Sequence, residues 1–243
     1  MSPMCQYSAK EGYSNDWHAV HYGTRAAGGA GLIIVEATAV WPEGRITPGD
    51  LGLWSDEQIP GLRRITDFIS SQGSVPGIQI AHAGRKASCA VPWEGGKQLD
   101  LKNGGWETVA PSAIPCKLLR VMPRELTIDE IENLIEAFAN GAKIAQESGF
   151  DAVEFHGAHG YLICQFLSNY SNKRNDIYGG SLENRMRFAL EIVKRSKEKV
   201  GADLPLLFRI SASEFIDGGL TLDETRIIAH SLEQAGVHCI DIS

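Results

Sequence analysis

The sequence predicts an α/β protein of the (β/α)8 barrel class, in which residues 1–243 form one partial barrel domain. Short apolar runs rich in Val, Ile, Leu and Phe alternate with amphipathic stretches of helical length, which is typical of strand–helix repeats. The runs are almost continuously apolar, as parallel strands covered on both faces are. No GxGxxG follows the first run, so a barrel is favoured over the open dinucleotide-binding sheet.

Five apolar runs are the expected strands, and MSPM at the N-terminus is the expected end of a further strand. The runs are 31–40, 75–84, 150–159, 205–213 and 237–243. A (β/α)8 barrel needs eight strands. We therefore expect a truncated barrel, with the last two strand–helix units, beyond Ser243, missing.

Five amphipathic stretches are the expected helices, at 16–28, 56–73, 128–149, 182–200 and 222–236. The second, third and fifth follow a capping box, in which Ser or Thr is followed three residues later by Glu or Gln. These pairs are Ser55 with Gln58, Thr127 with Glu130, and Thr221 with Glu224. Ser181 is the expected cap of the fourth helix. Gly73, Gly149 and Gly236 suit the left-handed position just after a helix.

One connection, residues 85–126, is much longer than the others. Connections of this length without regular structure are uncommon in compact domains and are usually lids or linkers. Trp93 and Trp106 lie within it and favour a packed lid. We therefore expect a lid-like insertion over the end of the barrel.

The composition indicates a water-soluble protein whose partner is a small molecule. The chain has 243 residues, is 43% hydrophobic and carries a formal net charge of −7. It has no long basic run, which argues against nucleic acid and anionic membrane as partners. The N-terminus is too polar for a signal peptide, and no apolar run reaches the roughly 20 residues that span a bilayer. A cytoplasmic location is expected, and a homo-oligomer is left open.

The cysteines do not form a recognisable framework. There are five of them, at widely spaced positions and with no CxxC. This argues against a set of disulfides and against a cysteine metal or iron–sulfur site in this stretch. No metal is expected.

Polar side chains interrupt the apolar runs near their C-terminal ends, where barrels carry their active sites. They are Cys5, Glu36, Thr38, Gln79, His82, His156, His159, Tyr161 and Arg209. A buried polar group costs stability unless it finds a partner. Several such groups at one end of a barrel predict a bound polar ligand.

Arg209 and Gln79 each allow two interpretations. Arg209 either contacts a ligand or forms an internal ion pair with Glu36. Gln79 offers a planar amide suited to the edge of a heterocycle, or it is a core glutamine bonded to the backbone.

The histidine pair in HGAHGYL allows three interpretations. It could ligate a metal with His82 or Glu154 as third ligand, or one histidine could be structural. Alternatively, His156 and His159 donate hydrogen bonds to one substrate oxygen, where each donor contributes roughly 3 kcal/mol to transition-state stabilisation. Tyr161 would then be a proton donor, because a phenol can protonate a carbanion or enolate.

Several segments resemble the Old Yellow Enzyme family of flavin-dependent ene-reductases. They include SPMCQYSA, NDWHAVHYG, QIAHAGRKA, GFDAVEFHGAHGYLICQFLS, SNKRNDIYGGSLENRMRF and LLFRISASEF. The resemblance is strongest to bacterial NADPH dehydrogenases and xenobiotic reductases, which have a cysteine beside the flavin and a His–His pair. It covers nearly the whole chain.

The resemblance implies a barrel that holds FMN at its mouth. It places Pro3, Met4 and Cys5 along the flavin, with Cys5 also tuning its redox potential and touching substrate. Ala37 lies against the ring, Gln79 bonds its pyrimidine edge, and Arg209 faces N1, where positive charge stabilises the reduced ring. Substrate is bordered by Tyr7 and clamped by the catalytic pair His156 and His159, while Tyr161 supplies the proton.

The activity implied is hydride transfer from NADPH or NADH through FMN to an activated alkene, such as an α,β-unsaturated carbonyl or a nitro compound. Family barrels hold phosphate on loops after strands 7 and 8, which would lie beyond Ser243. Two alternatives remain open: an inactive partial-barrel fragment, and a metal-dependent barrel hydrolase.

Overall fold

A single five-stranded parallel sheet forms the centre of the molecule. The computed structural model describes residues 1–119 and 121–243. The strands are β1 (Leu32–Ala39), β2 (Val75–Ala81), β5 (Ala152–Gly157), β6 (Leu206–Ile210) and β7 (Cys239–Ile242). They pair in the order β1-β2-β5-β6-β7, and every neighbouring pair is parallel. All five expected strands are confirmed, and each strand end coincides with the expected end or lies at most three residues inside it.

The N-terminal segment differs from the expectation, because MSPM does not form a strand of its own. It nevertheless lies beside β1. The amino group of Met1 donates to Leu32 O at 2.6 Å, and Met1 O accepts from Ile34 N at 3.0 Å. These two bonds hold the segment that leads to Cys5 against the edge of the sheet.

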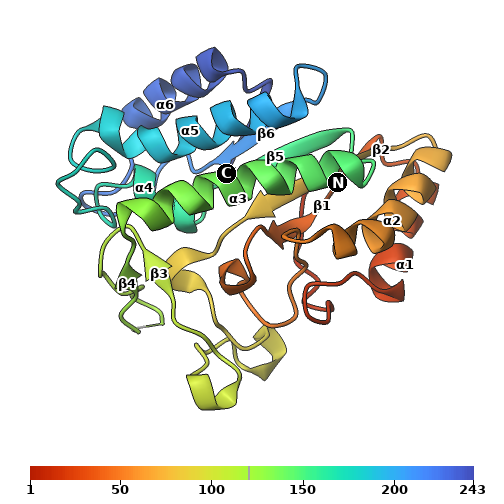
Figure 1. Ribbon diagram of the computed structural model, residues 1–243, viewed down its shortest axis with the longest axis horizontal. Coiled ribbons are helices and arrows are strands. Elements are labelled where there is room, and N and C mark those ends of the chain that lie inside the picture. Colours follow the sequence, from red (N-terminus) through yellow and green to blue (C-terminus); the bar gives the residue numbers. More distant parts are fainter. Residues whose placement is uncertain (120) are drawn as a thin grey trace.

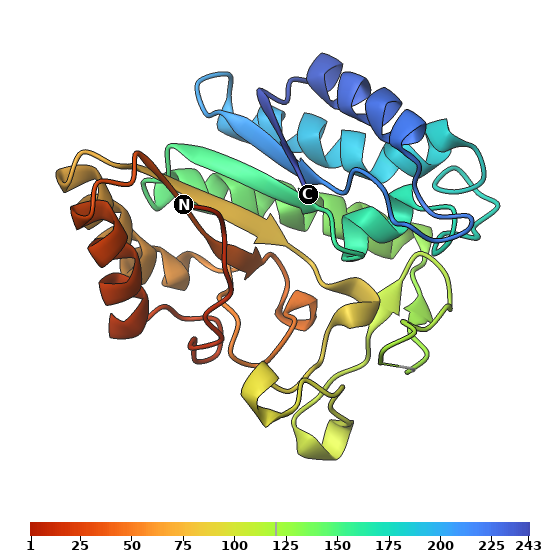
Figure 2. The same cartoon turned by 180° about the vertical axis from the view of Figure 1, so that it is seen from behind.

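Five long helices lie on one side of the sheet. They are α1 (Asp16–Ala27), α2 (Ile59–Ser71), α3 (Ile128–Glu147), α5 (Leu182–Val200) and α6 (Leu222–Ala235). Figure 1 shows α3 and α5 in front of the strands, with α1 and α2 beyond one end of the sheet and α6 beyond the other, and Figure 2, from behind, shows β2 and β5 in front of α3. No described helix combines the length and apolar character needed to cross a bilayer.

The three predicted capping boxes are all present. Ser55 and Gln58 open a short 3-10 turn, Asp56–Gln58, that runs into α2. Thr127 with Glu130 begins α3, and Thr221 with Glu224 begins α6. Asn15 and His18 form a fourth capping box at the start of α1. It was not predicted, because the third helical residue of a capping box is usually Glu or Gln and not His.

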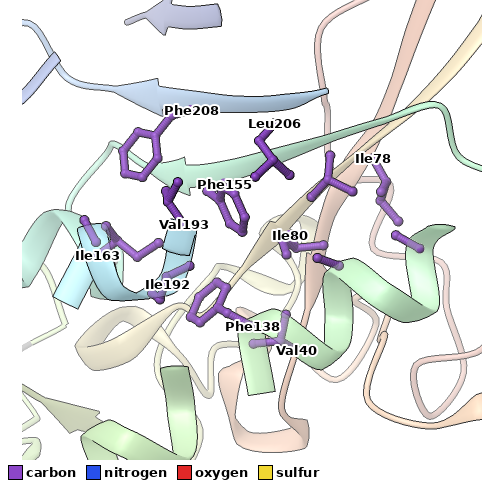
Figure 3. Packing of buried hydrophobic residues seen from close by; sticks show 14 of the residues in the cluster. Val40, Ile78, Ile80, Phe138, Phe155, Ile163, Ile192, Val193, Leu206 and Phe208 are labelled. Carbon is purple, nitrogen blue, oxygen red and sulfur yellow. The ribbon is translucent and has the colours of Figure 1, made fainter. Parts of the chain in front are cut away.

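The alternation of side chains along the strands separates the core from the site. Phe155 and Phe208 point toward the helices, with ring centroids 6.3 Å apart. Figure 3 shows them packed with Phe138 of α3 and with Ile192 and Val193 of α5. Each buried phenylalanine contributes about 2 to 3 kcal/mol. Because side chains alternate between the two faces of a strand, the residues next to these phenylalanines face the side without helices.

The segment 85–126 contains short regular pieces rather than one open loop. Its pieces include the 3-10 turns Pro92–Glu94 and Leu101–Asn103 and a parallel pair, β3 (Val109–Ala110) with β4 (Arg124–Glu125). Trp106 Nε1 donates to Glu43 O at 2.7 Å. The guanidinium of Arg45 lies between the rings of Trp106 and Trp54. Its Cζ is 5.1 Å from the centroid of the Trp106 ring and 5.6 Å from that of the Trp54 ring. The segment is therefore anchored to the loop after β1.

A short helix, α4 (Leu162–Leu167), was missed by the sequence analysis. All six of its residues are buried, so the stretch LICQFL lacks the polar face that marks an amphipathic helix. It begins directly after Tyr161 and thereby fixes where the HGAHGYL turn ends.

Candidate functional site

The residues predicted from HGAHGYL form one cluster at the end of β5. After the strand ends at Gly157, His159 adopts a left-handed backbone conformation with φ of +58°, and its N–H donates to Ser211 Oγ at 3.0 Å. The turn brings the His156 ring to 5.0 Å from the His159 ring and 4.9 Å from the Tyr161 ring, measured between centroids. Both neighbours meet the His156 ring edge to face.

The hydrogen bonding of His156 defines which ring nitrogen carries its proton. Ala158 N–H donates to His156 Nδ1 at 3.3 Å, so Nδ1 is the acceptor and Nε2 holds the hydrogen. Burial lowers the pKa of His156 to about 3, and the nearby His159 and Arg209 lower it further in the same direction. His156 is therefore a neutral ring with one N–H to donate.

The surroundings of Tyr161 keep its phenol protonated. Burial raises the pKa of Tyr161, and Cys5 and Tyr7 add to the effect. The ammonium of Lys86 lies 4.9 Å from the centre of the Tyr161 ring and donates to His159 O at 2.8 Å. Tyr161 shares a narrow pocket with Ala37 and Asp50.

Arg209 lies beside the histidines, but its partner is not the one considered above. In the register of β5 with β6 it pairs with His156. Its Nε is 3.4 Å from Asp241 Oδ2 on β7, so an ion pair with Glu36 is wrong. The reason is strand order, because β2 and β5 separate Glu36 on β1 from Arg209 on β6.

Glu36 is held in a separate buried network. Its carboxylate accepts from Tyr22 Oη at 3.0 Å and from the backbone N–H of Gln6. Burial raises its pKa to about 7. The hydroxyl of Thr38 donates to Glu36 O at 2.8 Å. Thr38 is therefore bonded to the backbone of its own strand and does not join the site.

Gln79 is bonded to a carboxylate rather than to the backbone. Its Nε2 donates to Glu154 Oε1 at 2.8 Å, and the two residues are register partners on β2 and β5. Glu154 is 1% exposed, and burial raises its pKa to about 7. Its Oε2 has no hydrogen-bond partner among the described residues. Glu154 was predicted only as an alternative metal ligand, although a glutamate inside an apolar strand is itself a signal of a functional residue.

The predicted residues of the N-terminal segment come together only in part. The Cys5 thiol lies beside the Tyr7 hydroxyl and the Ala37 backbone, and burial raises the pKa of Cys5, so the thiol stays neutral. Tyr7 meets Trp93 edge to face, with centroids 6.1 Å apart. Pro3 is half-buried, whereas Met4 is 63% exposed.

His82 does not join the histidine pair. It lines a different cavity, next to Trp41 and Trp106. Among residues 1–119 and 121–243, no three His, Cys, Asp or Glu side chains are grouped so that they could hold a metal ion. The histidine pair is therefore not part of such a group among the described residues.

Known proteins resemble this chain over its whole length. The model of the NADH:flavin oxidoreductase / NADH oxidase family matches residues 1–243. An NADPH dehydrogenase of Geobacillus sp. (strain WCH70) is 48% identical over 245 residues, which are 100% of this chain and 67% of that protein.

Solved structures give the same result for the fold. The chain superimposes with a TM-score of 0.88 on 2-naphthoyl-CoA reductase in complex with 2-naphthoyl-CoA, at 33% identity, and covers 37% of that protein. On the old yellow enzyme homologue from Zymomonas mobilis the TM-score is 0.85, at 29% identity, and the chain covers 68% of it. In both cases 100% of this chain is aligned, which confirms the barrel class.

The chain thus spans about two thirds of the NADPH dehydrogenase and of the old yellow enzyme homologue, and less of the larger reductase. Over that whole length, sequence and fold lead to one assignment. The chain belongs to the NADH:flavin oxidoreductase / NADH oxidase family, the Old Yellow Enzyme family that its motifs resemble.

Proposed function

We propose that this chain carries the catalytic face of an FMN-dependent ene-reductase that takes hydride from NADPH or NADH and acts on activated alkenes. The observation that carries the proposal is the row of polar side chains on the sheet face opposite the helices. Gln79, Glu154, His156 and Arg209 lie on three adjacent strands there, and Tyr161 adjoins His156. A cytoplasmic location fits five cysteines that are all free.

The residues present fit a flat heterocycle with polar edges. Arg209 Nε forms an ion pair with Asp241 Oδ2 at 3.4 Å but makes no hydrogen bond to a described residue, so its N–H is available to an acceptor on a ligand. Gln79 is fixed by Glu154, which leaves its amide oxygen and one N–H for a ligand. We propose that Gln79 and Arg209 hold the ring of FMN, with Pro3, Met4, Cys5 and Ala37 along it. FMN, when bound, supplies hydride transfer.

His156 and His159 would bind the oxygen of the substrate. The N–H on Nε2 of His156 is set by the bond from Ala158 to Nδ1. His159 is neutral too, because burial lowers its pKa, and its Nε2 lies 2.5 Å from Ser243 Oγ. Two neutral donors stabilise negative charge that develops on a carbonyl or nitro oxygen.

Tyr161 would hold the proton that the substrate α-carbon receives. A raised pKa keeps the phenol protonated until a strongly basic carbon is present. Cys5 and Tyr7 would border the substrate, since both lie close enough to Tyr161 to influence its ionisation.

We further propose that residues 85–126 form a lid within one 1–243 domain. The support is the contact of Trp93 with Tyr7 and the bond from Trp106 to Glu43 O. These contacts tie both halves of the segment to residues near the site.

The test replaces one histidine of the pair in protein purified with FMN. His156→Ala is expected to weaken phenol binding by about ten- to a hundredfold, because a donor to a phenolate is lost. Turnover of an enone is expected to fall by about a hundredfold. Phenol binding is followed by the change in flavin absorbance, and enone turnover by oxidation of NADPH.

The matched control is His230→Ala, which removes an exposed histidine of α6 and is expected to change neither quantity. Unchanged phenol affinity and enone turnover in His156→Ala would contradict the role of the histidine pair. If the protein retains no flavin absorbance once unbound FMN has been removed, the flavin assignment itself is contradicted.

A further inference from the structure

A second cavity lies outside the proposed flavin face. Its volume is about 390 Å³, and it lies between the N-terminal part of α3, the β3–β4 pair and the loop after β1. Figure 1 shows β3 and β4 next to that end of α3. The residues that matter for its chemistry are Trp41, His82, Trp106, Arg124, Asn133 and Leu134.

The direction of His82 separates this cavity from the site of Tyr161. Ala81 and Ala83, on either side of His82, line the narrow pocket that contains Tyr161. His82 lines the second cavity instead. Consecutive residues of the chain therefore line two different cavities, and His82 is a polar group of the second one.

His82 presents one neutral donor to this cavity. The side chain is 2% exposed, and Gly84 N–H donates to its Nδ1 at 3.0 Å. Burial lowers its pKa to about 4, so the ring is neutral and its hydrogen is on Nε2. No described residue accepts a hydrogen bond from Nε2. Gly44 packs against the ring, since a Cβ at Gly44 would lie 2.7 Å from His82 Cδ2.

Arg124 is already paired with two of the acidic residues that line the cavity, Glu107 and Glu130, whereas the carboxylate of Glu43 makes no hydrogen bond or ion pair with a described residue. Arg124 donates to Glu107 at 2.9 Å and to both oxygens of Glu130, at 2.8 and 2.9 Å. Its guanidinium is therefore neutralised and does not provide a free site for an anion. The remaining lining is largely apolar and aromatic, with Trp106 held in place by its bond to Glu43 O.

We propose that this cavity binds a small, uncharged, planar molecule with one carbonyl oxygen. The oxygen accepts the hydrogen bond from His82 Nε2, and the flat ring lies between Trp41, Trp106 and Leu134. Aromatic faces favour a planar partner, and a few polar groups in an apolar cavity of this size orient a ligand. The binding stands independently of the flavin proposal, because it uses none of the residues assigned to the flavin or substrate.

The test uses two probes of nearly equal shape. Acetophenone has the carbonyl oxygen, and α-methylstyrene replaces it with a methylene group. Calorimetric titrations are made on the His156→Ala protein, so that binding to the histidine pair does not contribute. Acetophenone is expected to bind about three- to tenfold more tightly than α-methylstyrene, as one neutral hydrogen bond allows.

Two further substitutions locate the binding. His82→Phe keeps a flat ring and removes the donor, and it is expected to abolish the preference for acetophenone. Because His82 is buried and its substitution can lower folding stability, Asn133→Trp on the exposed side of α3 provides a second route. It fills the cavity while His82 stays intact, and it is expected to abolish binding of both probes.

Three outcomes would overturn the proposal. The first is that acetophenone does not bind at its solubility limit. The second is that both probes bind equally well or are unaffected by Asn133→Trp. The third is that light scattering shows a dimer that Asn133→Trp dissociates, which would make the cavity a contact between two copies.

Discussion

Glu154 shows how much one buried side chain determines at the proposed site. It fixes the amide of Gln79 through a 2.8 Å hydrogen bond, and it shares its face of β5 with His156. Its second oxygen lacks a partner among the described residues. A carboxyl group in that position is costly when ionised, which is why burial raises its pKa to about 7.

Glu154→Gln is expected to stabilise the protein at alkaline pH. The folded state keeps the Glu154 proton up to about pH 7, whereas the unfolded chain loses it near pH 4.5. Stability is therefore lost as pH rises between these values, by roughly 3 kcal/mol once the group is ionised. Glutamine remains neutral and can still accept the bond from Gln79.

The measurement is urea unfolding of both proteins at about pH 5 and about pH 8. The variant should resemble the parent at the lower pH and exceed it at the higher. Glu183→Gln, at an exposed position in the first turn of α5, is the control. A variant that is less stable at both pH values would show that the carboxylate itself is required.

At the scale of elements, the helix starts were predictable because their signals are local. A capping box needs only residues three apart in sequence, and all three predicted boxes form. The near-continuous apolar runs likewise indicated parallel strands. The partner of Arg209 was not predictable, because it depends on which strand lies next to β6. The helix α4 was missed because its six residues are all buried.

Thr127→Ala is expected to destabilise the protein by about 1 kcal/mol. Thr127 Oγ1 accepts from Glu130 N–H at 3.2 Å, and Thr127 N–H donates to Glu130 Oε2 at 2.8 Å. The substitution removes the first hydrogen bond and leaves the Glu130 carboxylate, which is also paired with Arg124, less firmly held. The free energy of unfolding is measured in urea, with Thr127→Ser as a control that should lose only a few tenths of a kcal/mol. Equal losses in both variants would exclude the cap as the cause.

At the scale of the whole molecule, two sets of buried groups oppose each other in their dependence on pH. Burial raises the pKa of three carboxyl groups, those of Glu36, Glu154 and Asp50, to about 7, 7 and 6. Burial lowers the pKa of three histidines, His18, His82 and His156, to about 4, 4 and 3.

The signs of the two effects predict maximal stability on the acid side of neutrality. The carboxyls hold protons in the folded state that the unfolded chain has lost, so stability falls as pH rises toward their folded pKa. The histidines bind protons only when unfolded, so stability rises with pH up to about 6.5, the pKa of an unfolded histidine. Above that value only the falling contribution remains.

Melting temperatures measured across the pH range should therefore reach a maximum below about pH 7 and then decline. Glu36→Gln combined with Glu154→Gln is expected to flatten the decline. A melting temperature that rises steadily through neutrality in the unmodified protein would contradict this balance.

The alternation along β5 and β6 has a consequence for how the family can vary. Phe155 and Phe208 face the helices, while their neighbours His156 and Arg209 face the opposite side. Inserting a single amino acid into either strand would exchange the two sets of side chains. An imidazole or a guanidinium would then point into the hydrophobic core, and a phenyl ring would point into the substrate-binding side. New substrate preferences are therefore expected to arise by lengthening or shortening the loops, while the strands keep their length.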